Sequence, residues 1–442
     1  MITIFLISFF VGIACAVNSS PLEEQWNVTF HEKDDDFISS VIDSGSGGYV
    51  LAGTMGYSAS SANGDGFLYE VDSDGDLVWS TYFGGDQDDY FSVVLEDGEQ
   101  DYLIIGNTVS TDSGKRDALI INVDSEGNEI WNRTVYEDSS IINSAQRTSD
   151  GNLILAGMRA PLITAGGNLV ALLIKIDSEG NELWAKSFGP GWIRTYDSFS
   201  SVQETPEGGF IMAGVTNSFS SSNMEDGWLV KADSEGNEVW NRSFGDVDID
   251  MLNSVTLCSD GGYIAVGKSK PYGQSLFNAW IIKTDEDGNL LWEKRHFDGS
   301  DSYSNSIIEV SDGNYVIAGS IGSVSEGSVQ ASFGVDNYQG FLLKVDGNGE
   351  EVWSHIFEGY SDSAFITVIE SSGSYIVGGF MTPEGMSESD SLLVVLNDPV
   401  LQEEKVTNDG AYALDSEEQS PLSFTIMLAC LGVAFIATRR RL

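Results

Sequence analysis

The chain of 442 residues has little cysteine, and this shortage limits the kind of scaffold it can form. Its three cysteines are Cys15, Cys258 and Cys430. Cys15 lies in an apolar leader and Cys430 in an apolar tail, so the region between them keeps one thiol and forms no internal disulfide. A small scaffold held together by disulfide bonds is therefore excluded.

Histidine and the common catalytic motifs are also scarce. His31, His296 and His355 are far apart in the sequence and show no His-x-x-His spacing. We therefore expect no zinc site built from histidines. Neither a Gly-x-Ser-x-Gly elbow nor a Gly-x-x-x-x-Gly-Lys loop occurs, which argues against elbow-type hydrolases and P-loop nucleotidases.

Basic residues are few as well, at 21 against 68 acidic residues, for a formal net charge of −47. A surface of this sign repels nucleic-acid phosphates and anionic lipid headgroups, so neither is an expected partner. The acidity is spread along the whole chain, which favours solubility in salty surroundings, with cation binding as the alternative. With so many carboxylates, some pair is always in reach of another, so their presence does not argue for a glycosidase dyad.

The first residues are typical of a secretory leader. IFLISFFVGIA at residues 4–14 is an apolar run of signal-peptide length, and Ala14-Cys15-Ala16 then supplies a small-x-small cleavage pattern. We therefore expect a signal peptide over residues 1–16 and a mature chain that begins near Val17.

The other end carries an apolar segment and a basic cluster. Residues 422–438 are uncharged and are followed by three arginines. This pattern predicts a transmembrane helix or a cleaved sorting tail over residues 421–438 and a cytoplasmic end over residues 439–442. Residues 399–420 are acidic and lack a strand pattern, so we expect a flexible stalk. The location expected from both ends is the cell surface, with the chain before the helix outside and no other membrane contact.

The body of the chain is a repeat. Six copies of an Asp-x-x-Gly-x-x-x-Trp turn end at Trp79, Trp131, Trp184, Trp240, Trp292 and Trp353. Glycine-flanked apolar segments such as GGYVLAG (47–53) recur seven times in the same phase, as do apolar runs such as ALIINVD (118–124). Short apolar segments separated by turns predict four strands in each unit.

The seventh unit is split between the two ends of the repeat region. No tryptophan strand follows the last copy, whereas EEQWNVTF (23–30) carries Trp26 in the corresponding place. Pairing this strand with three C-terminal strands closes a ring and removes open sheet edges. We therefore predict an all-β, seven-bladed β-propeller over residues 17–398, with a linear solenoid as the alternative.

The repeated turns have both a structural and a functional interpretation. Asp, Ser, Gly and Asn suit a tight hairpin turn, and the tryptophans suit packing between blades. Acids near a glycine also resemble a calcium loop, although these turns are short and lack the later Glu of an EF-hand. We favour the structural interpretation for both motifs.

These units resemble a class of secreted archaeal and bacterial β-propeller repeat proteins, loosely grouped with quinoprotein-like and bulb-lectin-like repeats. The shared pattern is DGGYIxAG followed by WLxKxDxxGNxxW, and it covers residues 23–398. The resemblance implies the fold and a surface location, and no shared catalytic residues. The quinoprotein Thr-Gly-Lys motif and the bulb-lectin Gln-Asp-Asn-Tyr motif are missing, and Gly127 lies four residues before Trp131 rather than the three of a sialidase Asp-box.

The topology of a blade predicts which face contacts a ligand. Connections from an outer strand to the next inner strand, and from the second to the third strand, emerge on one face and include the longest insertions. The candidates on this face are Asp36, Asp89, Asp197, Asp250, Asp301 and Asp362. If these acids surround the channel mouth they favour a divalent cation, with Ca²⁺ as the candidate, and solvated turn acids are the alternative.

The expected function is binding or adhesion without catalysis, with an extracellular protein or polysaccharide as the partner. The alternatives are a polysaccharide hydrolase or lyase at the channel mouth and a structural envelope protein. Glycosylation sequons directly follow a tryptophan at Asn27, Asn132 and Asn241.

Overall fold

The structure is a computed structural model that describes residues 22–33, 35–57, 64–85, 88–98, 101–109, 116–135, 139–160, 168–190, 195–220, 224–322 and 337–398. These residues belong to the unit Met1–Pro399 and form seven antiparallel sheets of four strands each. The predicted signal peptide, stalk and C-terminal tail lie outside the described residues. Within the described part, no helix is long and apolar enough to cross a membrane.

The first four blades follow one another along the chain. Blade 1 consists of β2 (Asp35–Asp43), β3 (Tyr49–Tyr57), β4 (Asp65–Val71) and β5 (Leu77–Phe83). Blade 2 consists of β6 (Asp89–Asp97), β7 (Asp101–Val109), β8 (Arg116–Val123) and β9 (Glu129–Val135). Blade 3 consists of β10 (Ser140–Arg147), β11 (Leu153–Arg159), β12 (Val170–Ile176) and β13 (Glu182–Phe188). Blade 4 consists of β14 (Asp197–Glu204), β15 (Phe210–Thr216), β16 (Asp226–Ala232) and β17 (Glu238–Phe244).

The remaining three blades complete the ring. Blade 5 consists of β18 (Asp250–Leu257), β19 (Tyr263–Ser269), β20 (Asn278–Thr284) and β21 (Leu290–His296). Blade 6 consists of β22 (Asp301–Glu309), β23 (Tyr315–Gly322), β24 (Tyr338–Val345) and β25 (Glu351–Ile356). Blade 7 consists of β26 (Asp362–Ser371), β27 (Ser374–Thr382), β28 (Asp390–Asn397) and β1 (Glu23–Phe30).

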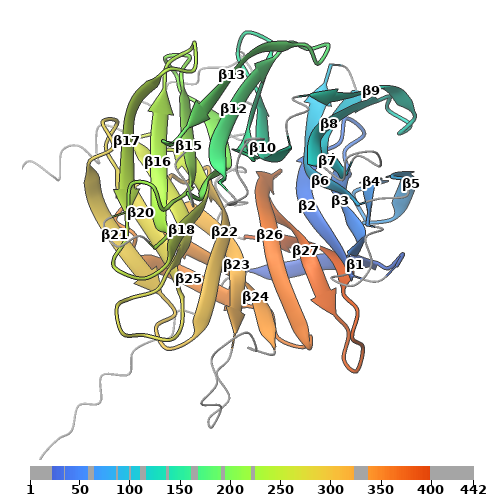
Figure 1. The fold of residues 1–442 in the computed structure, drawn as a ribbon. Coiled ribbons are helices and arrows are strands. Elements are labelled where there is room, and N and C mark those ends of the chain that lie inside the picture. Colours follow the sequence, from blue (N-terminus) through green and yellow to red (C-terminus); the bar gives the residue numbers. More distant parts are fainter. Residues whose placement is uncertain are drawn as a thin grey trace, which may run out of the picture. The chain divides into compact units, whose positions relative to one another are not determined.

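The seventh blade is assembled from both ends of the propeller sequence. Strand β1 pairs antiparallel with β28, so that Trp26 lies opposite Val395 and Phe30 opposite Ser391. Figure 1 shows the blue strand β1 in the same blade as the orange strands β26 and β27. The predicted seven four-stranded blades and the ring closure by the N-terminal strand are confirmed. The solenoid alternative is wrong, because the first and last blades contact each other through β2 and β26.

The hydrophobic core lies between the blades. Every residue of β12 and β15 is buried, because the middle strands of adjacent blades cover one another on both faces. One core cluster, for example, joins Leu173 of blade 3 to Phe210 and Trp228 of blade 4. This arrangement explains the unbroken apolar runs that the sequence places in the second and third strands.

Six of the seven outer-strand tryptophans, all except Trp353, pack against the turn glycine of the next blade. The ring of Trp184 lies against Gly236, whose φ of +75° places it in the left-handed region. The indole of Trp26 donates to the Ser73 carbonyl at 3.0 Å, which links blade 7 to blade 1. In the turn itself, the Asp233 carboxylate accepts the backbone N–H of Asn237 at 2.8 Å. The structural interpretation of both motifs, as turn formers and inter-blade packing groups, is confirmed.

Candidate functional site: the central channel and its mouth

A β-bulge occurs at the same place in each of the seven innermost strands. In β14, for example, the pairing with β15 shifts between Phe199 and Ser201, which leaves Ser200 as the extra residue. A bulge adds one residue to a strand and redirects its side chain. We call the seven extra residues the bulge ring; they are Ser39, Ser92, Asn143, Ser200, Asn253, Asn305 and Ile366.

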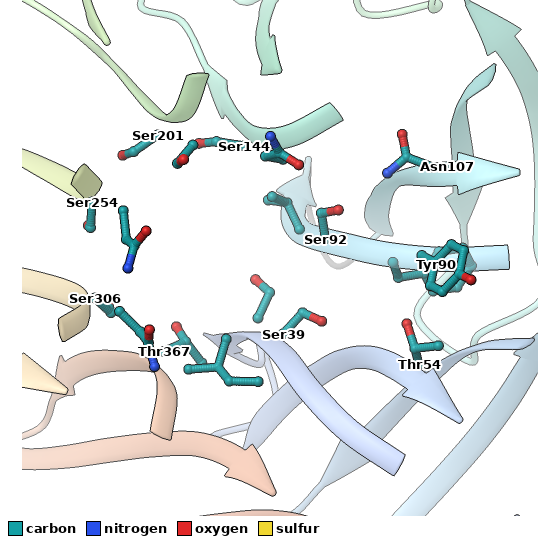
Figure 2. A pocket seen from close by; sticks show the side chains of 18 of the residues that line it. Ser39, Thr54, Tyr90, Ser92, Asn107, Ser144, Ser201, Ser254, Ser306 and Thr367 are labelled. Atoms are coloured by element: carbon teal, nitrogen blue, oxygen red, sulfur yellow. The ribbon is translucent and has the colours of Figure 1, made fainter. Parts of the chain in front are cut away.

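The residues that follow the bulges form a second ring around the same space. We call it the hydroxyl ring; its members are Ser40, Val93, Ser144, Ser201, Ser254, Ser306 and Thr367. Both rings line one cavity of about 520 Å³, the channel cavity. Figure 2 shows Ser144, Ser201, Ser254, Ser306 and Thr367 around this open space. The repeat thus places hydroxyl and amide groups from every blade at the centre of the propeller.

The channel cavity is almost uncharged, although the protein as a whole is strongly acidic. Among the described residues that line it, one carries a charge, Arg116, and this guanidinium lies 5.0 Å from the ring centroid of Tyr90. The net charge of −47 is therefore carried elsewhere. A ligand in the channel meets neutral hydrogen-bonding groups rather than a concentration of carboxylates.

Side chains of both rings also connect adjacent blades. In the bulge ring, the amide of Asn253 donates to the Ser304 carbonyl at 2.8 Å, from blade 5 to blade 6. In the hydroxyl ring, Ser201 accepts the backbone N–H of Val255 at 3.3 Å, from blade 4 to blade 5. A hydroxyl that accepts such a bond keeps its own hydrogen to donate. The lining therefore stabilises the ring and still offers donors to the channel.

The six candidate aspartates lie at or next to the starts of the innermost strands, and most of them are buried. The exposed fractions are 0% for Asp197 and Asp250, 2% for Asp36, and 6% for Asp89 and Asp301, whereas Asp362 is half-buried. Several carboxylates brace the preceding blade: Asp301 accepts the N–H of Phe277 at 2.8 Å, and Asp362 accepts the N–H of Tyr338 at 2.8 Å.

The buried carboxylates are held by backbone and hydroxyl donors. Asp250 accepts the N–H of Asp246 at 2.8 Å and of Lys270 at 3.2 Å. Burial raises the pKa of Asp36, Asp89, Asp197 and Asp250 above the ordinary value, although hydrogen bonds oppose the shift. In the described part of the chain, no three residues of the types Asp, Glu, His and Cys lie close enough together to hold a metal ion.

Three of the six aspartates line cavities: Asp89 lines one of about 430 Å³, and Asp36 and Asp362 share another. Asp36 and Asp362 line a space of about 410 Å³ together with Phe37 and Phe380. Asp362 and Phe380 also line a second space of about 380 Å³, which we call the mouth pocket. The mouth pocket spans blades 5, 6 and 7, and it shares Asn253 and Asn305 with the channel cavity.

The walls of the mouth pocket are aromatic, and one of its lining residues is a lysine. Tyr303 and Tyr338 lie with ring centroids 5.6 Å apart, and Phe380 lines the side formed by blade 7. Lys268 of β19 contributes the ammonium group. The prediction of the ligand face named acids alone and did not include these residues. Aromatic faces beside amides and a charged group are typical of small-molecule and glycan sites.

The three sequons lie on outermost strands, as expected from their place after a tryptophan. Asn27 and Asn132 are exposed and Asn241 is half-buried. Each side chain donates to a glutamate three residues earlier, for example Asn132 to Glu129 at 2.7 Å. The positions of Asn27 and Asn132 are open to attachment of a glycan.

Comparisons with known proteins agree with the fold. No family model matches the chain, and no curated protein matches it. The WD40 domain of Neurospora crassa Pan2 is similar, with a TM-score of 0.50 and 9% identity over 87% of this chain and 97% of that one.

Two further solved structures have lower scores. The β-propeller domain of the Trilobed protease from Pyrococcus furiosus, described as having an open velcro topology, has a TM-score of 0.46 and 9% identity, over 82% of this chain and 94% of that one. The Penicillium chrysogenum α-L-arabinanase complexed with arabinobiose has a TM-score of 0.44 and 15% identity, over 68% of this chain and 91% of that one. At such identities the likeness concerns the β-propeller fold and not activity.

Proposed function

We propose that this protein is a cell-surface binding module. Its ligand, an extracellular protein or polysaccharide, occupies the mouth pocket and the channel cavity and is not chemically changed. The supporting observation is that these two spaces adjoin at Asn253 and Asn305, which line both. A ligand that follows them meets aromatic walls first and then two rings of uncharged side chains, all of which except Val93 and Ile366 can form hydrogen bonds.

In this proposal the six aspartates hold the ligand face in shape. Asp301 and Asp362 brace neighbouring blades at the mouth pocket through backbone hydrogen bonds. Because the two rings are fixed before a ligand arrives, their side chains lose little conformational entropy on binding. Ca²⁺ has no part in the proposal, because binding uses the neutral groups and aromatic walls described above.

The proposed location is the outer surface of the cell. It is supported by the apolar leader at residues 4–14 and by the three arginines that follow the apolar tail. Treatment of intact cells with an impermeant amine-reactive label tests this location. Labelling of the propeller lysines supports it, and labelling only after lysis contradicts it.

The binding function is tested with arrays of polysaccharides and of extracellular proteins probed with the full chain. We expect Phe380→Ala to weaken binding by at least about tenfold, because it removes one wall of the mouth pocket. Leu183→Ala is the matched control, because Leu183 lies on the outermost strand β13 and is 51% exposed.

Three results would contradict the proposal. An equal loss of affinity in Phe380→Ala and Leu183→Ala would place the ligand outside the mouth pocket. Turnover of a bound polysaccharide would support the hydrolase or lyase alternative. Absence of binding on both arrays would favour a structural envelope role.

A further inference from the structure

Among the described residues, Lys268 lacks the carboxylate partner that the buried lysines of the third strands have, as do the half-buried Lys231 and Lys270, which do not line the mouth pocket. Lys175, Lys283 and Lys344 on third strands each have a carboxylate oxygen 2.7 Å from Nζ. Within the described part of the chain, no carboxylate lies within 4.0 Å of the Lys268 ammonium, the limit for a salt bridge. Instead, its Nζ lies 4.6 Å from the ring centroid of Phe277 and 4.8 Å from that of Tyr303.

Two carboxylates, Asp301 and Glu225, act electrostatically on this lysine, and Asp301 is already engaged. Asp301 accepts the hydroxyl hydrogens of Tyr303 and Tyr338, each at 2.6 Å, and the backbone N–H of Phe277 at 2.8 Å. These bonds fix both tyrosine rings and occupy three of the roughly four acceptor sites of the carboxylate. They leave the three N–H donors of the Lys268 ammonium to a group that enters the pocket.

The surroundings favour an anionic ligand group at this point. Burial lowers the pKa of Lys268 more than the charges of Asp301 and Glu225 raise it, so the ammonium is partly desolvated and a further negative charge at its Nζ is favourable. Aromatic faces beside the ammonium contribute a weaker attraction than a direct charge-assisted hydrogen bond. A carboxylate that replaces pocket water at Lys268 therefore gains more than a neutral hydroxyl does.

The rest of the pocket favours a sugar. Tyr303 and Tyr338 present aromatic surface to the pocket, against which a sugar ring can pack. Asn253, Asn305 and Ser320 offer hydrogen bonds to hydroxyl groups. The volume of about 380 Å³ lies in the range of small-ligand pockets. A ligand with many carboxylates is disfavoured by the net charge of −47, whereas one carboxylate placed at Lys268 is compatible with it.

We infer that Lys268 selects a polysaccharide in which a carboxylate-bearing sugar is flanked by neutral sugars. In this arrangement the acidic sugar occupies the mouth pocket with its carboxylate on the ammonium. The adjacent neutral sugar extends towards the bulge ring. The inference rests on the proposed binding function and narrows it to one class of ligand.

The test uses two disaccharides that differ at one carbon, cellobiouronic acid and cellobiose, titrated calorimetrically into the full chain. We expect cellobiouronic acid to bind at least about tenfold more tightly, with a preference that decreases as salt is added. Lys268→Met abolishes the preference and Lys268→Arg retains it, because the arginine keeps the charge. Lys186→Met on β13 is the control for net charge and leaves the preference unchanged.

The possible failures are distinguishable. Equal binding of the two disaccharides, or a preference that survives in Lys268→Met, overturns the inference and leaves the binding function standing. Binding of neither disaccharide also overturns it, and a ligand found on the arrays then still supports the binding function. Tighter binding of an acetylated aspartyl dipeptide than of cellobiouronic acid overturns the assignment to a polysaccharide.

Discussion

The contact between an outer-strand tryptophan and the glycine of the next blade can be tested by adding one methyl group. At Gly236, a Cβ atom would lie 2.6 Å from two ring atoms of Trp184, well inside van der Waals contact. Gly236 is buried, so neither the ring nor the turn can move away without disturbing the packing between blades 3 and 4. Gly236→Ala should therefore destabilise the propeller at this junction.

The expected loss of unfolding free energy in Gly236→Ala has two contributions. A residue with a side chain in the left-handed region costs about 1–2 kcal/mol, and overpacking of a well-packed contact costs about 1–3 kcal/mol more. Gly151→Ala is the matched control, because Gly151 has a φ of +83° in a similar turn but no atom within 4 Å of a Cβ. The free energy of unfolding should thus fall by about 1–3 kcal/mol more in Gly236→Ala than in Gly151→Ala.

Urea unfolding, followed by tryptophan fluorescence, measures both variants under the same conditions. A lower midpoint for Gly236→Ala than for Gly151→Ala, with unchanged slopes, is the expected result. Equal midpoints would refute the reasoning, because the two substitutions share the backbone cost and differ in the contact with Trp184.

Three other predictions follow from single residues. Burial, together with the charge of Asp250, raises the pKa of Asp226 from 3.8 to about 6. The folded state therefore favours the protonated carboxyl, and the stabilisation that comes from this difference is fully present below about pH 4 and is lost as the pH rises through 6. Asp226→Asn should therefore stabilise the protein at pH 7 by on the order of 2 kcal/mol, and thermal unfolding that shows the same pH dependence in both proteins would contradict this. Asp250→Ala leaves the backbone N–H groups of Asp246 and Lys270 without their acceptor and should lower the free energy of unfolding by about 3 kcal/mol. An unchanged urea midpoint would show that this carboxylate does not stabilise the two connections. In a glycosylating host, Asn132→Gln should remove the mass of one glycan, and an unchanged mass spectrum apart from the substitution would show that Asn132 is unmodified.

The architecture could be predicted from the sequence because several features of each repeat indicate it independently. Each unit carries a turn, a tryptophan and two apolar runs, and the position of Trp26 shows where the missing strand lies. Each of these signals depends on local chemistry, such as a glycine with positive φ or a strand buried on both faces. For that reason the strand bounds are also close to those observed, as for the apolar run at residues 118–124, which corresponds to β8 at Arg116–Val123.

The candidate site was predicted less completely. The aspartates of the ligand face could be found from their place in the loops, but burial decides what a carboxylate does, and burial depends on the neighbouring blade. Asp301 illustrates this, because its partners Phe277 and Tyr338 come from blades 5 and 6.

The sequence also contains a pattern that indicates which residues line the channel. A Ser or Asn followed by Ser recurs in the innermost strands, as in Ser39-Ser40, Asn143-Ser144 and Asn253-Ser254. A strand that only faces a core would alternate polar and apolar residues, so two adjacent polar residues indicate the bulge that turns one of them into the channel. Lys268 had no such signal, because its aromatic neighbours Phe277 and Tyr303 are distant in sequence or lie in another blade.

The central claim, that the ligand occupies the mouth pocket and continues into the channel cavity, is tested most directly by a structure of the full chain with the tightest-binding ligand from the arrays. The account predicts ligand density between Tyr303 and Phe380 that extends to Asn253 and Asn305. Density on the outer strands, or on the opposite face of the propeller, would contradict it.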